Sequence, residues 1–183
     1  MHPVDDVIVG LWLAFWIYWL VASAHVKAAA TRSTRLVGIR VGVVVVALVL
    51  LRAGVFGGHG ATTSNPVLQG IGLAVFLSGL ALAIWARLYL GRNWGMPMSR
   101  KVDPELVTTG PYRRVRHPIY SGIVLAMVGT AIAVTPYWLV AVVVLGAYFS
   151  YSAAVEERTM EATFPDTYPQ YKRATKRLIP FIF

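Results

Sequence analysis

The sequence contains no cysteine, which excludes disulfides, thiolate chemistry and cysteine-based metal sites. Charged residues are also scarce. They make up 14% of the 183 residues, and 57% of the residues are hydrophobic. A soluble domain has about 25% charged residues. This composition predicts an integral membrane protein.

Acidic residues are few, with 8 aspartates and glutamates against 17 lysines and arginines, so the formal net charge is +9. A charge of this size can indicate nucleic-acid binding. Here, however, the basic residues fall between apolar stretches and do not form one patch on a soluble domain. We therefore expect no nucleic-acid partner and interpret the basic residues as determinants of orientation in the lipid bilayer.

Long apolar stretches account for most of the chain, and each is close to the ~20 residues that cross ~30 Å of hydrocarbon. The pattern predicts an all-α integral membrane protein with five transmembrane helices in a single membrane domain, residues 1–183. The last two spans are joined only by a short turn around Pro136. The five predicted spans are residues 7–26, 36–56, 67–90, 119–134 and 138–155.

The loops differ in charge between the two sides of the predicted membrane. Segments 27–40 and 87–118 and the C-terminal tail carry almost all the lysines and arginines, and the other side has only Arg52. The positive-inside rule then places the N-terminus outside and the C-terminus in the cytoplasm. The basic tail, rich in tyrosine, predicts a C-terminal interfacial helix. Because the alanine, valine and arginine usage is typical of a high-GC bacterial genome, we expect a multi-pass protein of the bacterial inner membrane.

Small residues recur on one face of the third predicted span. Gly70, Ala74 and Ser78 are spaced four apart, a pattern that lets helices approach closely. The simpler interpretation is helix packing within the chain. The alternative is a homodimer contact.

The most unusual charged stretch is GPYRRVRHPIYSG, residues 110–122, directly before the fourth predicted span. Proline disfavours helical geometry in the residue before it and is favoured at the first helical position. His117 should therefore precede the helix, and Pro118 should open it. A helix start offers unsatisfied N–H groups and a positive dipole end, where a carboxylate or phosphate binds. The side chains expected around these N–H groups are Tyr112, Arg113, Arg116 and His117.

A second polar group, Glu156 with Glu157, follows the fifth apolar stretch. His117 and Glu156 are almost the same number of residues from Pro136, on opposite sides of that turn. Because a helix rises about 1.5 Å per residue, both should return to the same depth and be neighbours at the cytoplasmic edge. Cations on one element and carboxylates on the other suit a zwitterion such as the amino-acid end of S-adenosylmethionine. The alternative is a structural clamp between the glutamates and nearby arginines.

The charged stretch also resembles a known family. Together with LYLGRNW at 88–94, Glu105-Leu106-Val107 and EERTMEATFPDTYPQYKRATKRLIPF at 156–181, it is similar to the isoprenylcysteine carboxyl methyltransferases. These are integral membrane enzymes that use S-adenosylmethionine and are related to phospholipid N-methyltransferases. The resemblance covers residues 88–181, which it implies are a methyltransferase region with a cytoplasmic cofactor pocket. The N-terminal spans in residues 1–66 match only in being apolar.

The resemblance implies a role for individual residues. Glu156 would bind the ammonium group of S-adenosylmethionine, the helix start at Arg116 and His117 its carboxylate, and the backbone near Leu106 its adenine. The full set of implied cofactor contacts is Leu106, Val107, Tyr112, Arg116, His117, Pro118, Ile119 and Glu156. Tyr120, Gly122 and Glu157 belong to the same motif without an assigned role.

Two positions depart from the family pattern. Pro104 stands where the family often has a histidine two residues before Leu106-Val107. Ser152 stands where the prenylcysteine enzymes have an arginine that helps to hold substrate. The second departure bears on the methyl acceptor more than on the cofactor.

The acceptor is expected to be isoprenyl or lipid-like. A carboxylate acceptor is already ionised, whereas an amine must lose a proton, and Glu157 or His117 could remove it. Glu157 and Arg113 are the candidate catalytic residues. Asn93, Trp94 and Arg113 are the candidate acceptor contacts.

Two other functions remain open on the residues alone. The first is an NADPH-dependent sterol-type membrane reductase, whose C-terminal region is related. The second is a non-enzymatic membrane scaffold with a structural polar clamp. We expect no metal site, because His25 and His59 lie far apart in the predicted topology and lack ligand spacing.

Overall fold

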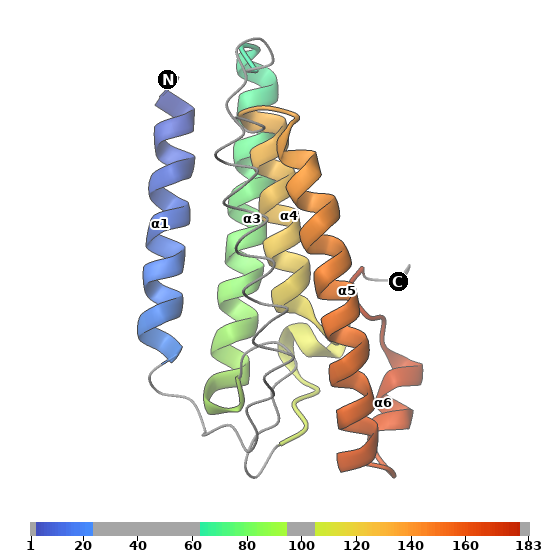
Figure 1. Ribbon diagram of the computed structural model, residues 1–183. Helices are drawn as coiled ribbons and strands as arrows, with labels where there is room; N and C mark the ends of the chain where they lie inside the picture. Colours follow the sequence, from blue (N-terminus) through green and yellow to red (C-terminus); the bar gives the residue numbers. More distant parts are fainter. Residues whose placement is uncertain (1–2, 24–62, 95–104, 180–183) are drawn as a thin grey trace, which may run out of the picture.

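The computed structural model describes residues 3–23, 63–94 and 105–179. Within them the regular structure is helical, apart from one isolated parallel bridge between Val115 and Lys176. Figure 1 shows α1, α3, α4 and α5 running along one another, with the short α6 beside the far end of α5. The elements are α1 (Pro3–Ser23), α3 (Pro66–Leu90), η1 (Gly91–Asn93), η2 (Gly110–Arg113), α4 (Pro118–Ala133), α5 (Trp138–Thr163) and α6 (Tyr168–Ala174).

Three described helices, α1, α3 and α5, are long and apolar enough to cross a membrane. Helix α4 is also apolar but has 16 residues, which corresponds to about 24 Å. The predicted spans 67–90, 119–134 and 138–155 begin within one residue of α3, α4 and α5. The predicted span 36–56 lies outside the described residues, so the total of five helices stays a prediction.

Helix α5 continues well past residue 155, where the predicted span ends. Its 26 residues extend about 39 Å, more than the ~30 Å of the hydrocarbon core. The end of an apolar stretch marks where burial in lipid ends, but the helix itself continues through residues with high helix propensity, including Glu156 and Glu157. The last turns of α5 can therefore lie outside the hydrocarbon.

The starts of α3 and α4 follow from local sequence. The Asn65 side chain accepts a hydrogen bond from the Val67 N–H at 2.9 Å, and Pro66 occupies the first turn of α3. At α4, His117 precedes the helix and Pro118 occupies its first turn. The prediction from the His-Pro pair is therefore confirmed.

Helices α3 and α4 pack closely along a series of glycines. A Cβ atom on Gly79 would lie less than 3.0 Å from the backbones of Gly122 and Ala126. Gly72 and Gly129 are equally close to the opposite helix. Between helices in lipid, where no hydrophobic effect drives association, such close backbone contact supplies the packing energy.

This interface uses a different face of α3 from the predicted one. Gly70, Ala74 and Ser78 are exposed among the described residues, and nothing lies within 4 Å of a Cβ built on Gly70. The expected intramolecular contact is therefore not made through this face in the described part of the chain. The homodimer alternative stays a prediction.

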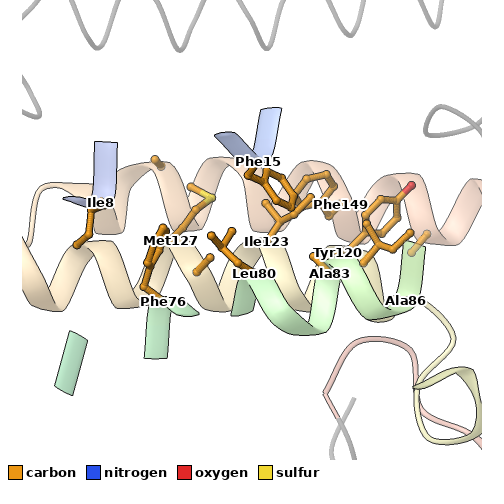
Figure 2. Packing of buried hydrophobic residues seen from close by; sticks show 14 of the residues in the cluster. Ile8, Phe15, Phe76, Leu80, Ala83, Ala86, Tyr120, Ile123, Met127 and Phe149 are labelled. Atoms are coloured by element: carbon orange, nitrogen blue, oxygen red, sulfur yellow. The ribbon is translucent and has the colours of Figure 1, made fainter. Parts of the chain in front are cut away.

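Large side chains fill the space on both sides of the glycines (Figure 2). Phe76 on α3 is fully buried, and Trp12 from α1 packs edge-on against it with ring centroids 5.5 Å apart. The Trp12 Nε1–H also donates to Thr130 Oγ1 on α4 at 3.2 Å. Because a polar group in lipid needs an internal partner, this bond attaches α1 to the α3–α4 pair.

The close packing of α3 against α4 at Gly72, Gly79, Gly122 and Gly129 is called the glycine seam here. A matched pair of substitutions on α3 tests it. Gly79→Ala should lower the melting temperature of the detergent-purified protein, because its methyl group collides with the α4 backbone; overpacking of this kind costs about 1 to 3 kcal/mol. Gly70→Ala makes the same change on an open face and should be neutral or slightly stabilising, since alanine favours helix over glycine. Equal melting temperatures for the two variants would contradict this account of the seam.

Candidate functional site

The residues of α6 and those after it, called the C-terminal tail here, fold back onto the segment before α4. Val115 forms a parallel bridge with Lys176. The Arg116 N–H donates to the Lys176 carbonyl at 2.8 Å, and the His117 N–H donates to the Arg177 carbonyl at 3.1 Å. The Ser121 hydroxyl donates to the Leu178 carbonyl. The tail therefore occupies two backbone donors that the sequence suggested would be open to an anion.

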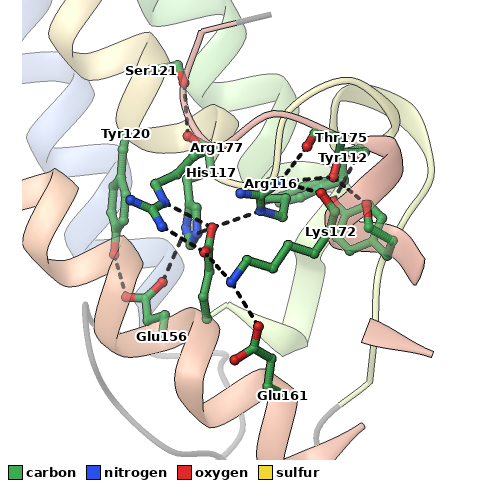
Figure 3. Close-up of polar contacts among 12 residues, drawn as sticks. Tyr112, Arg116, His117, Tyr120, Ser121, Glu156, Glu161, Lys172, Thr175 and Arg177 are labelled. Atoms are coloured by element: carbon green, nitrogen blue, oxygen red, sulfur yellow. Dashed lines mark hydrogen bonds and ion pairs between the residues drawn. The ribbon is translucent and has the colours of Figure 1, made fainter. Parts of the chain in front are cut away.

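Arg116, Lys172 and Arg177 converge beside α5 (Figure 3), where all three contact Glu157. Its side chain is 2% exposed, and Oε1 accepts from Arg116 Nε at 2.8 Å. Arg177 Nη2 lies 3.0 Å from Oε2, and Lys172 Nζ lies 3.5 Å from the same oxygen. A buried carboxylate requires such compensation, because desolvation of an isolated charge is very costly.

Arg116 is held on its other side by the tail. Its Nη1 donates to the carbonyls of Lys172 and Thr175. Lys172 in turn forms an ion pair with Glu161 at 2.8 Å. The start of α4, the end of α5 and the tail thus form one ion-pair network.

Glu156 precedes Glu157 but has different surroundings. Its side chain is 26% exposed. The Tyr120 hydroxyl donates to Oε1 at 2.6 Å, and His117 Nδ1 lies 3.5 Å from Oε2. The predicted proximity of His117 and Glu156 is therefore confirmed, and Glu156 is the more accessible of the two adjacent carboxylates.

Three rings form the wall beside Glu156. His117 stacks on Tyr120 with ring centroids 5.5 Å apart and planes 1° from parallel. Tyr120 stacks on Phe149 of α5 at 4.6 Å and 12°. Stacked rings on both faces restrict the Tyr120 side chain and direct its hydroxyl toward Glu156.

The carboxylates also change the protonation of their neighbours. Burial by itself lowers the pKa of His117, but the hydrogen bonds and charges of Glu156 and Glu157 outweigh it, so this pKa lies above its ordinary value. Hydrogen bonding to Glu157 raises the pKa of Arg177. His117 therefore favours the protonated form, whose positive charge lies 3.5 Å from an oxygen of each glutamate.

The structure also describes the remaining predicted cofactor contacts. Tyr112 is 6% exposed, its hydroxyl donates to the Ala86 carbonyl at 3.3 Å, and its own carbonyl accepts from the Tyr171 hydroxyl at 2.7 Å. Burial raises the pKa of Tyr112. Leu106 and Val107 are half-buried, and Pro118 and Ile119 are buried in the first turn of α4.

The predicted acceptor contacts Asn93 and Trp94 have partners at the end of α3. Asn93 Nδ2 donates to Glu105 Oε2 at 3.0 Å. Trp94 packs edge-on against Trp19, with ring centroids 5.7 Å apart. Arg113 is exposed. Asn93 and Trp94 thus belong to a second cluster at the end of α3.

Arg87 organises that second cluster, although the sequence showed it only as one of many basic residues. It is 6% exposed, and its Nη1 and Nη2 donate to the carbonyls of Gly91 and Ala22, both at 2.8 Å. Its guanidinium lies 4.7 Å from the Trp94 ring centroid. Arg87 therefore fastens the end of α1 to the end of α3, because it satisfies carbonyls that a helix end leaves open.

Sequence reasoning also missed the partners of Glu157 in the tail, Lys172 and Arg177. The basic tail predicts an interfacial helix, but its alternation of basic and aromatic residues does not show which cations point inward. Within the described residues, no group of three or more histidine, aspartate or glutamate side chains could hold a metal ion.

The fold and this network define a helical integral membrane protein with a charged site at one end of its helices. The phospholipid methyltransferase family model matches residues 68–167, more than half of the chain. The chain therefore belongs to this family, and the resemblance seen in the GPYRRVRHPIYSG stretch is confirmed.

The chain is also similar to individual curated proteins. The chain is 29% identical to the cobalt-zinc-cadmium resistance protein CzcN of Cupriavidus metallidurans, over 77% of the chain and 63% of that protein. It is 29% identical to protein-S-isoprenylcysteine O-methyltransferase B of Arabidopsis thaliana, over 63% of the chain and 60% of that protein. The chain thus spans less than two thirds of the length of these curated relatives.

A solved structure shares the fold. The eukaryotic intramembrane Ras methyltransferase ICMT (isoprenylcysteine carboxyl methyltransferase) matches with a TM-score of 0.64 at 22% identity, covering 100% of this chain and 69% of the other. The helical arrangement in Figure 1 is therefore one already known from a membrane protein.

The network predicts that Glu157 stabilises the folded tail. Glu157→Gln leaves the buried Arg116 uncompensated and should cost about 3 kcal/mol, as is typical when one partner of a buried ion pair is removed. Trypsin should then cleave the tail faster, and the melting temperature should fall. Glu161→Gln is the matched control, because Glu161 is 40% exposed and forms only the surface pair with Lys172, so its loss should cost less than about 1 kcal/mol. Equal cleavage rates for the two variants would show that Glu157 does not hold the tail.

The raised pKa of His117 predicts a pH dependence with a definite sign. The folded-state pKa of His117 lies above the unfolded value of about 6.5. Protonated His117 therefore stabilises the folded protein fully at pH values below the unfolded pKa, and this stabilisation is lost as the pH rises through the folded-state pKa. The melting-temperature difference between wild type and His117→Gln should therefore be largest in mild acid and should shrink at higher pH. A difference that grows with pH would mean that His117 is buried in its neutral form.

Proposed function

We propose that this protein is a membrane methyltransferase that uses S-adenosylmethionine and methylates an isoprenyl or lipid-like acceptor. The observation that carries the proposal is the contrast between the two adjacent glutamates. Glu157 is 2% exposed and compensated by cations, whereas Glu156 is 26% exposed beside Tyr120 and His117. Family membership supplies the reaction class.

The described residues fit the amino-acid end of this cofactor. The Glu156 carboxylate suits its ammonium group, because it is an anion whose side chain is 26% exposed beside Tyr120 and His117. Arg116 suits the carboxylate. Its Nε and Nη1 bond to Glu157 and the tail, and within the described residues its Nη2 makes no hydrogen bond.

The other cofactor contacts are proposed from the family pattern. The backbone near Leu106 and Val107 would hold the adenine, and Tyr112, Pro118 and Ile119 would line the same site. The burial of Tyr112 and of the first turn of α4 supports a role in shaping this site. The proposed cofactor-binding region is residues 88–181.

Glu157 has a positioning role in this proposal rather than a catalytic one. A general base needs a lone pair within reach of the acceptor proton, but both oxygens of Glu157 contact cations and the side chain is sealed from solvent. His117 could act as the base for an amine acceptor only in its neutral form, which its raised pKa disfavours. A carboxylate acceptor needs none.

S-Adenosylmethionine supplies an electrophilic methyl group on a sulfonium when bound. The acceptor lone pair forms the new bond to the methyl carbon while the sulfur keeps the electron pair of the broken bond. The task of the protein is then to align the two partners, which must approach to about 3 to 3.5 Å. Asn93 and Trp94 stay the proposed acceptor contacts.

The proposed topology has five transmembrane helices, the N-terminus outside, and the site and C-terminus in the cytoplasm of a bacterial inner membrane. The charge distribution along the sequence supports this orientation. The polar cofactor would enter from the cytoplasm, and the apolar acceptor would enter from the lipid. The close α3–α4 seam leaves no space for an acceptor between those two helices.

The proposal predicts cofactor binding that depends on Glu156. Purified protein should bind S-adenosylhomocysteine in isothermal titration calorimetry, and Glu156→Gln should weaken binding by roughly 10- to 100-fold, because an ammonium–carboxylate interaction in a partly buried site is worth about 1.5 to 3 kcal/mol. Glu161→Gln removes a carboxylate further along α5 and should bind normally.

Methyl transfer is the direct test of the enzyme class. Membranes that contain the protein should transfer a radiolabelled methyl group from S-adenosylmethionine to a lipid or protein fraction, and Glu156→Gln membranes should not. Absence of binding to the intact wild-type protein, together with no labelled product, would refute the proposal.

A further inference from the structure

Tyr120 has a position that the cofactor contacts proposed above do not explain. It lies in the first turn of α4 and is 8% exposed. Its ring is stacked against His117 on one side and Phe149 on the other. Figures 2 and 3 show the ring packed at the end of the core with its hydroxyl directed toward Glu156.

The two oxygens of Glu156 contact different residues at the start of α4. Tyr120 donates to Oε1 at 2.6 Å, and His117 lies 3.5 Å from Oε2. A hydroxyl bond of this length to an ionised carboxylate is among the stronger protein hydrogen bonds. A glutamate side chain without such a bond samples several rotamers, and ordering it on binding lowers the affinity for a ligand. The bond to Tyr120 removes this cost before a ligand arrives.

We infer that Tyr120 is a positioning residue, whose hydroxyl holds the Glu156 carboxylate in the orientation that binds the ammonium group of an amino-acid ligand. The inference rests on the proposed function, because it assigns that ligand group to Glu156. The Tyr120 hydroxyl has one proton and donates it to Glu156. Tyr120 therefore acts through Glu156.

A purely structural role for the same bond makes a different prediction. If the hydroxyl only fastened α4 to α5, its removal would weaken all ligands of the site alike. If it orients Glu156, only ligands that carry the ammonium group lose affinity. S-Adenosylhomocysteine carries this group, whereas 5′-methylthioadenosine has the same nucleoside and lacks the amino-acid end, so the pair separates the two roles.

Tyr120→Phe keeps the stacked ring and deletes only the hydroxyl. The dissociation constant of S-adenosylhomocysteine should rise roughly tenfold, while that of methylthioadenosine should change less than about twofold. Tyr171→Phe is the matched control, because it deletes another phenol hydrogen bond at the same end of the protein, the 2.7 Å bond to the Tyr112 carbonyl. In this control the ratio of the two dissociation constants should stay at the wild-type value.

A double variant provides a second readout that needs only S-adenosylhomocysteine. If Tyr120 acts through Glu156, Tyr120→Phe should add no further loss in the Glu156→Gln background. Independent, additive losses would overturn the inference, as would an unchanged ratio of dissociation constants in Tyr120→Phe. Either result with a wild type that binds S-adenosylhomocysteine leaves the proposed function intact, whereas a wild type that neither binds it nor transfers a labelled methyl group overturns both.

Discussion

The buried carboxylate of Glu157 holds together three segments that are far apart in the sequence. Its oxygens accept from Arg116 before α4 and from Arg177 in the tail, and Glu157 itself belongs to α5. None of these charges could remain in a poorly hydrated site without the others. The shape of the site at this end of the helices therefore depends on one compensated ion-pair network.

The adjacent position of Glu156 follows from that arrangement. Successive residues of an α-helix point about 100° apart, so a helix rotated to bury Glu157 among cations necessarily turns Glu156 toward Tyr120 and His117. Two identical side chains thus acquire different environments. Glu157 is 2% exposed among cations, and Glu156 is 26% exposed.

The glycine seam holds α4, whose first turn carries residues of this site, against α3. Gly79 and Gly122 bring the backbones of α3 and α4 into direct contact, and the Trp12–Thr130 hydrogen bond adds α1 to the pair. In lipid, where packing rather than hydrophobic burial holds helices together, such contacts fix the height and rotation of α4. The position of the residues at its first turn is set by this interface.

Local rules were sufficient for the helix starts. The His117-Pro118 pair predicted the start of α4, and the approach of His117 to Glu156 followed from the helical rise on both sides of Pro136. The same local rules did not predict the end of α5, because this helix continues past the apolar stretch. Helix propensity and hydropathy are separate properties, and the apolar pattern reports only the second.

The sequence by itself determined the membrane class, the family, and the proximity of His117 and Glu156 at one end of the helices, because composition, the His-Pro motif and the helical rise are local properties. Only the tertiary structure decided that Glu157 is sealed while Glu156 is accessible, that Lys172 and Arg177 turn inward, and that α3 packs through Gly72 and Gly79 rather than Gly70. These outcomes depend on the rotation of each helix about its axis. That rotation is set by contacts between distant segments, which no local pattern specifies.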